Sequence, residues 1–191
     1  MSELWWLALY IQSAPPVRIF STTSWDPADT KLAGILQLEV FTDASPVALM
    51  YYFPSLNLAY HAPLPTNPPS DTIFWFEALA VCCAIHHAAD VWACDFSPKL
   101  HRLLVRTDNM NSVDMFSTLH AKPPYNNILI SSINARTRSS LDVRVLHISG
   151  QANIIADAIS RDNYDLAHHL IPTLTILPFT PPRDALGAAL Q

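Results

Sequence analysis

The sequence predicts an α/β domain in which helices cover both faces of a mixed five-stranded sheet. Three observations predict this class: β-rich runs separated by short Pro, Ser and Asn breaks, long apolar stretches with helical spacing, and late β-rich runs that alternate with helices. The first β-rich runs follow one another directly, which predicts a three-stranded antiparallel meander. Two later runs each follow a helix, so we expect them to join the sheet in parallel through crossover connections.

The chain is expected to open with a short helix over residues 2–12 that bears two adjacent tryptophans. A pair of prolines ends this helix, and a short strand is expected over 17–22. The three meander strands are then expected over 38–45, 48–54 and 56–64, followed by a Pro-rich connection.

A long apolar helix is expected next, capped by Ser70 or Asp71. Its apolar side chains at 74, 78, 81, 85 and 88 share one face, which predicts burial against the sheet. The remaining elements are expected as strands over 101–108 and 141–149 and as helices over 109–121, 125–139 and 151–161.

Composition narrows the class of protein further. Half of the 191 residues are hydrophobic and 14% are charged, which argues against a disordered chain. The formal net charge of −5 lacks the basic excess of a free-standing nucleic-acid binder. The three cysteines lack the spacing of a zinc site or a disulfide framework, and the apolar opening is too short to span a bilayer. We therefore expect an intracellular protein, cytoplasmic or nuclear, that is neither secreted nor bound to a membrane.

Four acidic residues stand where strands and helices could aim carboxylates at one point. Asp43 and Asp108 end apolar strands, whereas Glu77 and Asp157 lie on helices expected to cover the sheet. A few carboxylates around an open site suit Mg²⁺, which prefers hard oxygen ligands. Clustered carboxylates repel one another, so the cluster makes physical sense mainly with metal present. The set predicts a site in which two divalent cations support phosphodiester hydrolysis.

Taken singly, these residues have simpler interpretations. Asp108 fits a helix N-cap, and Asp43 before Ala-Ser-Pro fits an Asx-turn. His147, near the end of an apolar strand, fits a hydrogen-bonded structural histidine equally well. The ordered set of four acids with matching flanks is what favours the metal site.

The flanks of the four acids carry a resemblance to a known family. FTDAS, FWFEALAV, VRTDNMNSV and HISGQANIIADAISR resemble the motifs of a type 1 ribonuclease H domain, and more closely those of the ribonuclease H attached to retroelement reverse transcriptases. The closing segment is similar to the form in long-terminal-repeat and DIRS-like elements. The opening ELWWLALYIQ resembles the segment that joins polymerase to ribonuclease H in DIRS-like elements. The resemblance covers roughly residues 2–162.

The resemblance implies a ribonuclease H-like fold and an endoribonuclease that hydrolyses the RNA strand of an RNA–DNA hybrid, with a reverse transcriptase polymerase domain as partner in cis or in trans. Its implied division is a connection from a polymerase part over 1–36, the ribonuclease H-like domain over 37–162 and a Pro-rich tail over 163–191. Two Mg²⁺ or Mn²⁺ ions would be held by Asp43, Glu77, Asp108 and Asp157.

Further residues take roles from the same resemblance. His147 matches a catalytic histidine thought to assist product release, and Asn153 matches a position that steadies the loop before Asp157. Ser45 and Asn109 are expected near the hybrid backbone, and the resemblance implies substrate binding by Ser45, Asn109 and Asn153. The chain departs from the family over 46–50, where a Gly-x-Gly turn is usual, so we expect a reshaped first hairpin.

Functions of different classes remain open. The intact acid set favours the metal-dependent ribonuclease H. The acidic net charge and the missing glycines favour a catalytically weak or inactive retroelement-derived interaction module. A related nuclease acting on DNA is a weaker third candidate.

Overall fold

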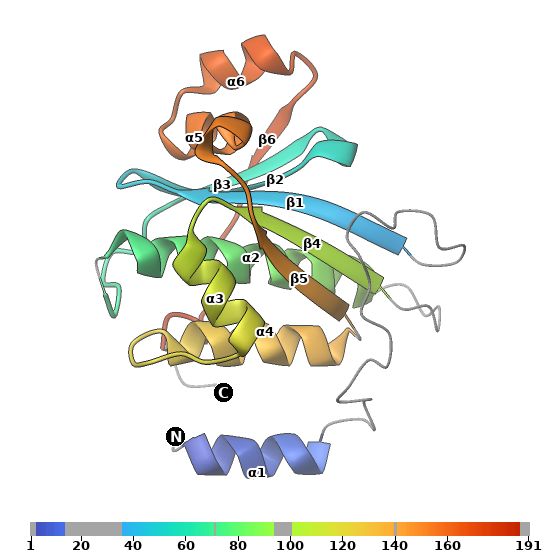
Figure 1. Cartoon of the computed structure of the whole chain (residues 1–191), viewed down its shortest axis with the longest axis vertical. Helices are drawn as coiled ribbons and strands as arrows, with labels where there is room; N and C mark the ends of the chain where they lie inside the picture. The colour runs from blue at the N-terminus through green and yellow to red at the C-terminus, as the bar shows by residue number, and fades with distance from the viewer. Residues whose placement is uncertain (1–2, 14–35, 71, 94–100, 140, 188–191) are drawn as a thin grey trace.

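The computed structural model describes residues 3–13, 36–70, 72–93, 101–139 and 141–187 (Figure 1). These residues form a mixed sheet with helices on both of its faces, as the sequence predicts. The strand order is β5-β4-β1-β2-β3-β6. The predicted strand over 17–22 lies outside the described residues.

The predicted meander forms the middle of the sheet. β1 (Leu36–Ala44), β2 (Ala48–Phe53) and β3 (Leu58–Pro63) pair in antiparallel order. All six residues of β2 are buried, because elements pack on both faces of this strand. A short 3-10 turn, η1 (Pro54–Leu56), leads into Asn57, whose φ of 49° is a left-handed conformation that asparagine tolerates.

The two crossover strands extend the sheet on the other side of β1. β4 (His101–Thr107) pairs in parallel with β1, and β5 (Leu141–His147) pairs in parallel with β4. Parallel neighbours end at the same edge of a sheet, so the residues that follow β1 and β4 come out side by side. The candidate site lies at this edge.

The larger core lies between the sheet and three helices, α2 (Ile73–Ala93), α3 (Met110–Thr118) and α4 (Asn126–Arg138). α2 is long and apolar enough to cross a membrane by length and composition, but 72% of its most apolar stretch is buried inside the protein. Full burial of Trp75 and Leu79 shows that α2 is the core helix of the fold.

A smaller core covers the opposite face of the meander. α5 (Ile154–Ser160) and α6 (Tyr164–Leu170) pack there, and a 3-10 turn, η2 (Gly150–Ala152), leads into α5. Buried Ile159 of α5 packs with Met50 and Tyr52 of β2. The last turn of α5 is thereby held over the strand next to Asp43.

The predicted count of five strands is wrong, because β6 (Thr175–Pro178) adds a sixth strand at the edge of the sheet. β6 pairs in parallel with β3. The prolines of this tail argue against a strand, but the run Thr-Leu-Thr-Ile-Leu has strong β propensity. Pro178 stands at the end of an edge strand, where a missing N–H donor costs little. Beyond β6, Phe179 and Ala185 pack in the larger core.

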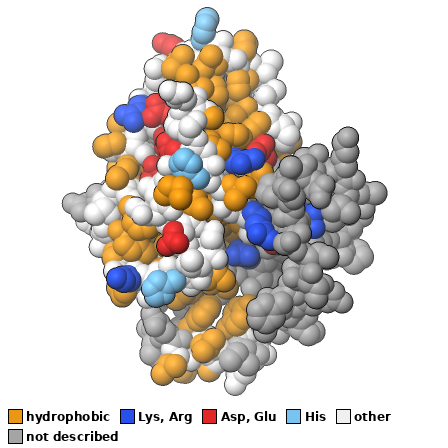
Figure 2. Space-filling model, viewed as in Figure 1, with side chains coloured by type: hydrophobic (Ala, Val, Ile, Leu, Met, Phe, Trp, Pro, Cys, Tyr) orange, Lys and Arg blue, Asp and Glu red, His pale blue; other side chains and the backbone are white. Residues whose placement is uncertain are grey.

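The predicted N-terminal helix is present as α1 (Glu3–Ser13). The Tyr10 hydroxyl lies 2.9 Å from Thr137 Oγ1, which connects α1 to α4. Large apolar side chains of α1 are exposed, among them Leu4 at 79% and Trp5 at 54%. Figure 2 shows hydrophobic side chains at the lower end of the molecule, where α1 lies.

Candidate metal centre

Three of the four predicted acids meet at one edge of the sheet. Phe41 of β1 pairs with Arg106 of β4, and Asp43 and Asp108 each stand two residues further along. Glu77, near the start of α2, approaches the same point from the larger core. One carboxylate oxygen from each of Asp43, Glu77 and Asp108 lies within 4.8 Å of the others.

The carboxylates of this triad are placed where negative charge is costly. Burial, together with the charges of Asp43 and Asp108, raises the pKa of Glu77 to about 9. Burial also raises the pKa of Asp43 to about 6, although a hydrogen bond from Ser160 opposes this. Glu77 Oε2 is buried and has no hydrogen-bond partner among the described residues. A hard divalent cation would supply the missing positive charge and a ligand contact for this oxygen, so the residues present fit Mg²⁺ or Mn²⁺.

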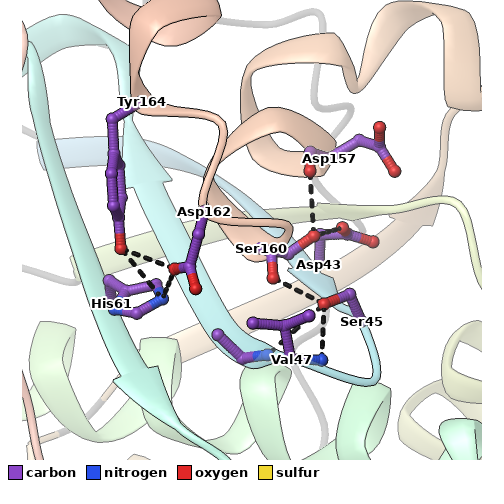
Figure 3. A network of polar contacts seen from close by, with 9 residues as sticks. Asp43, Ser45, Val47, His61, Asp157, Ser160, Asp162 and Tyr164 are labelled. Carbon is purple, nitrogen blue, oxygen red and sulfur yellow. Dashed lines mark hydrogen bonds and ion pairs between the residues drawn. The ribbon is translucent and has the colours of Figure 1, made fainter.

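The fourth predicted acid, Asp157, stands apart from the triad. Its side chain is 49% exposed, and its Oδ1 lies 2.6 Å from Arg161 Nε, one helical turn further along. Figure 3 shows its carboxylate turned away from Asp43. Asp157 is still close enough for its charge to raise the pKa of Asp43. The structure therefore places Asp157 beside the triad but pairs its carboxylate with the Arg161 side chain.

The predicted substrate-binding residues are engaged with the protein itself. Ser45 and Asn153 are each 1% exposed. Asn153 Nδ2 donates a hydrogen bond to the backbone oxygen of Thr42 at 3.1 Å, which ties the turn before α5 to β1. Asn109 caps α3 by accepting hydrogen bonds from two backbone amides. Their roles toward substrate stay predictions.

His147 lies at the end of β5, opposite Thr107, with an exposed side chain. This position puts it at the same edge of the sheet as the triad. Its predicted role in product release stays a prediction.

Two residues beside the triad were not predicted. Ser160 Oγ donates a hydrogen bond to Asp43 Oδ2 at 2.5 Å. Gly150 lies beside Asp108, such that a Cβ added there would be 3.3 Å from Asp108 Oδ2. Both residues belong to the motif that ends in Ala-Asp-x-x-Ser-Arg, so the motif indicated that they lie near the site. Their spacing in the sequence does not indicate which atoms they contact.

A side chain at position 150 is expected to disturb Asp108. In Gly150→Val the branched methyl groups enter the space beside Asp108 Oδ2, so we expect the affinity for Mn²⁺ to fall about tenfold. The thermal midpoint should change little, because residue 150 is exposed. Titration calorimetry and thermal melts measure both quantities. Ala152→Val in the same exposed turn is the control, and an equal loss of affinity in that variant would contradict the prediction.

Comparison with known proteins identifies the fold. No family model matches the chain, and no curated protein matches it significantly. Ribonuclease H1 from the halophilic archaeon Halobacterium salinarum NRC-1 superposes with a TM-score of 0.50 at 16% identity, covering 69% of this chain and 99% of that chain. LC11-RNase H1, solved in complex with an RNA/DNA hybrid, superposes with a TM-score of 0.54 at 13% identity, covering 68% of this chain and 98% of that chain. The N-terminal RNase H domain of Rv2228c from Mycobacterium tuberculosis superposes with a TM-score of 0.51 at 11% identity, covering 71% of this chain and 98% of that chain.

Likeness at such low identity shows the fold alone. The order of elements, the mixed sheet and these superpositions together show that the described residues adopt a ribonuclease H-like fold. The predicted fold class is confirmed.

Proposed function

We propose that this protein is a metal-dependent endonuclease that hydrolyses the RNA strand of RNA–DNA hybrids. The observation that carries the proposal is the convergence of Asp43, Glu77 and Asp108 at one edge of a ribonuclease H-like sheet. One protein with the same fold was solved with an RNA/DNA hybrid bound, which supports this class of substrate.

The chain's own residues have separate roles in this proposal. Asp43, Glu77 and Asp108 would hold Mg²⁺ or Mn²⁺, and Asp157, once released from Arg161, would be a further ligand in a site for two ions. Exposed ion pairs contribute about 1 kcal/mol or less to stability, so breaking the pair between Asp157 and Arg161 costs little. When bound, such ions stabilise the charge on the scissile phosphate and activate the attacking water. Asp43 and Glu77 are buried, so they anchor the position of the site.

The finer assignment is a ribonuclease H of a retroelement reverse transcriptase, working inside the cell with a polymerase domain in cis or in trans. The motif resemblance described above supports this part of the proposal.

A second candidate is an interaction module with weak or no catalysis. The exposed apolar side chains of α1, including Leu4 and Trp5, favour it because such surface is usually covered by a partner. The pairing of Asp157 with Arg161 also favours it, since one expected ligand is engaged elsewhere.

Cleavage of a labelled RNA–DNA hybrid by the purified chain, with Mg²⁺, with Mn²⁺ and with EDTA, tests the proposal. We expect the RNA strand to be cut with either metal and to stay intact in EDTA. A DNA duplex of the same sequence is the control substrate, and its cleavage would indicate a DNA nuclease instead. No cleavage by protein whose fold is verified by circular dichroism would favour the interaction module.

A further inference from the structure

Ser160, the last residue of α5, makes a buried contact with the triad (Figure 3). Its side chain is 0% exposed, and its Oγ lies 2.5 Å from Asp43 Oδ2 and 3.0 Å from the backbone oxygen of Asp157. A hydroxyl has one hydrogen to donate, and a bond to a carboxylate is stronger than a bond to a neutral carbonyl. Ser160 therefore donates to Asp43.

Ser45, in the turn between β1 and β2, holds Ser160 in place. Its Oγ donates a hydrogen bond to the backbone oxygen of Ser160 at 2.5 Å. Ser45 Oγ in turn accepts hydrogen bonds from the backbone amides of Val47 at 2.9 Å and Ala48 at 3.3 Å. One donor and two acceptor sites are all that a serine hydroxyl has, so Ser45 has no capacity left for a substrate. Its contacts close the turn without glycine and fasten it to the end of α5.

The need for such a device follows from the charges around Asp43. Glu77 and Asp108 each place a carboxylate oxygen within 4.8 Å of an Asp43 oxygen. Without a cation, repulsion between the Asp43 and Asp108 carboxylates favours rotation of the Asp43 carboxylate away from Asp108. A short hydrogen bond to Oδ2 resists this rotation and keeps the group aimed at the triad. Figure 3 shows Ser45, Ser160 and Asp43 connected in series.

We propose that Ser160 is a positioning residue that holds the Asp43 carboxylate in its metal-binding orientation, and that Ser45 locks Ser160 by its backbone oxygen. This inference rests on the proposed function, because it requires that the triad binds a divalent cation. It also gives Ser45 a role different from the one expected from sequence, as a support of the site instead of a contact to the hybrid.

A purely structural serine offers a matched control. Ser132 of α4 is also buried, at 1% exposed, and its Oγ donates to the backbone oxygen of Ile128 at 2.8 Å. Neither residue belongs to the triad. Ser132→Ala and Ser160→Ala remove the same group from buried helical positions, so a loss of general packing or of a buried hydrogen bond affects both variants alike.

The test is Mn²⁺ binding by titration calorimetry on the whole metal-free chain, with thermal melts in EDTA. We expect Ser160→Ala to weaken Mn²⁺ binding about tenfold, as removal of residues that orient metal ligands does. Ser132→Ala should lower the thermal midpoint without changing Mn²⁺ affinity. Ser45→Ala should weaken Mn²⁺ binding less than Ser160→Ala, and adding it to Ser160→Ala should cause no further loss, because both changes act through one contact.

The outcomes separate this inference from the proposed function. Ser160→Ala with the Mn²⁺ affinity of the wild type would overturn the inference and leave the nuclease proposal standing. If the wild type binds Mn²⁺ more tightly than Ser160→Ala but cuts no hybrid, the inference is supported and the nuclease proposal is overturned. No Mn²⁺ binding by the wild type overturns both. If Ser160→Ala fails to fold, Ser45→Ala is judged by the same criterion.

Discussion

Asp43→Asn is expected to abolish metal-dependent cleavage of the hybrid and to leave the metal-free protein as stable as the wild type or more so. Bound cations supply several kcal/mol of transition-state stabilisation, and the loss of about 4 kcal/mol corresponds to about a thousandfold in rate. Asp43 connects the parts of the candidate site. It belongs to the triad, accepts the Ser160 hydrogen bond and has its pKa raised by the charge of Asp157. The rate of RNA-strand cleavage in saturating Mg²⁺ measures the first effect.

The stability half of this prediction follows from the pKa of Asp43, which burial raises to about 6. At neutral pH the ionised form therefore destabilises the metal-free fold, and the neutral amide removes that cost. Asp114→Asn, an exposed acid on α3, is the control and should change neither rate nor thermal midpoint. A variant that unfolds at clearly lower temperature in EDTA would point to a structural role for Asp43 instead.

The fold was largely predictable because its periodic elements are long and apolar. The meander, α2 and the two crossover strands show their period in the sequence, and the structure has each of them. β6 was missed because its signal is a four-residue strand among prolines, and only its pairing with β3 makes it a strand. Local pattern does not report whether an edge is available to be paired.

The sequence predicted which acids lie close together in the site, but it did not predict the hydrogen bonds and ion pairs that their side chains make. Strand ends and helix positions predict that Asp43, Glu77 and Asp108 meet, because backbone topology decides this. The pairing of Asp157 with Arg161 is a rotamer choice between two nearby partners on an exposed helix face, which a motif does not encode. The Ser160 hydrogen bond likewise depends on how α5 packs over β1 and β2.

Glu77→Gln is expected to stabilise the metal-free protein increasingly as the pH rises from about 6 to about 9. Burial raises the pKa of Glu77 from 4.5 to about 9, so between these values the folded protein holds a proton that the unfolded chain has released. Folding stability of the wild type therefore falls with rising pH in this window, by at most about 1.4 kcal/mol per pH unit from this group. Glutamine does not titrate, and its amide can donate to a neighbouring carboxylate.

Thermal melts in EDTA at several pH values measure this difference, since about 1 kcal/mol shifts the midpoint of a domain this size by roughly 2–4 °C. Asp114→Asn corrects for the other titrating groups and should follow the wild type. Excess Mg²⁺ should reverse the order at the alkaline end, because the cation stabilises the ionised triad and has one ligand fewer in the variant. Parallel pH curves for wild type and Glu77→Gln would mean that Glu77 is ionised at no cost. The triad would then lack the electrostatic need for a cation on which its assignment as a metal centre depends.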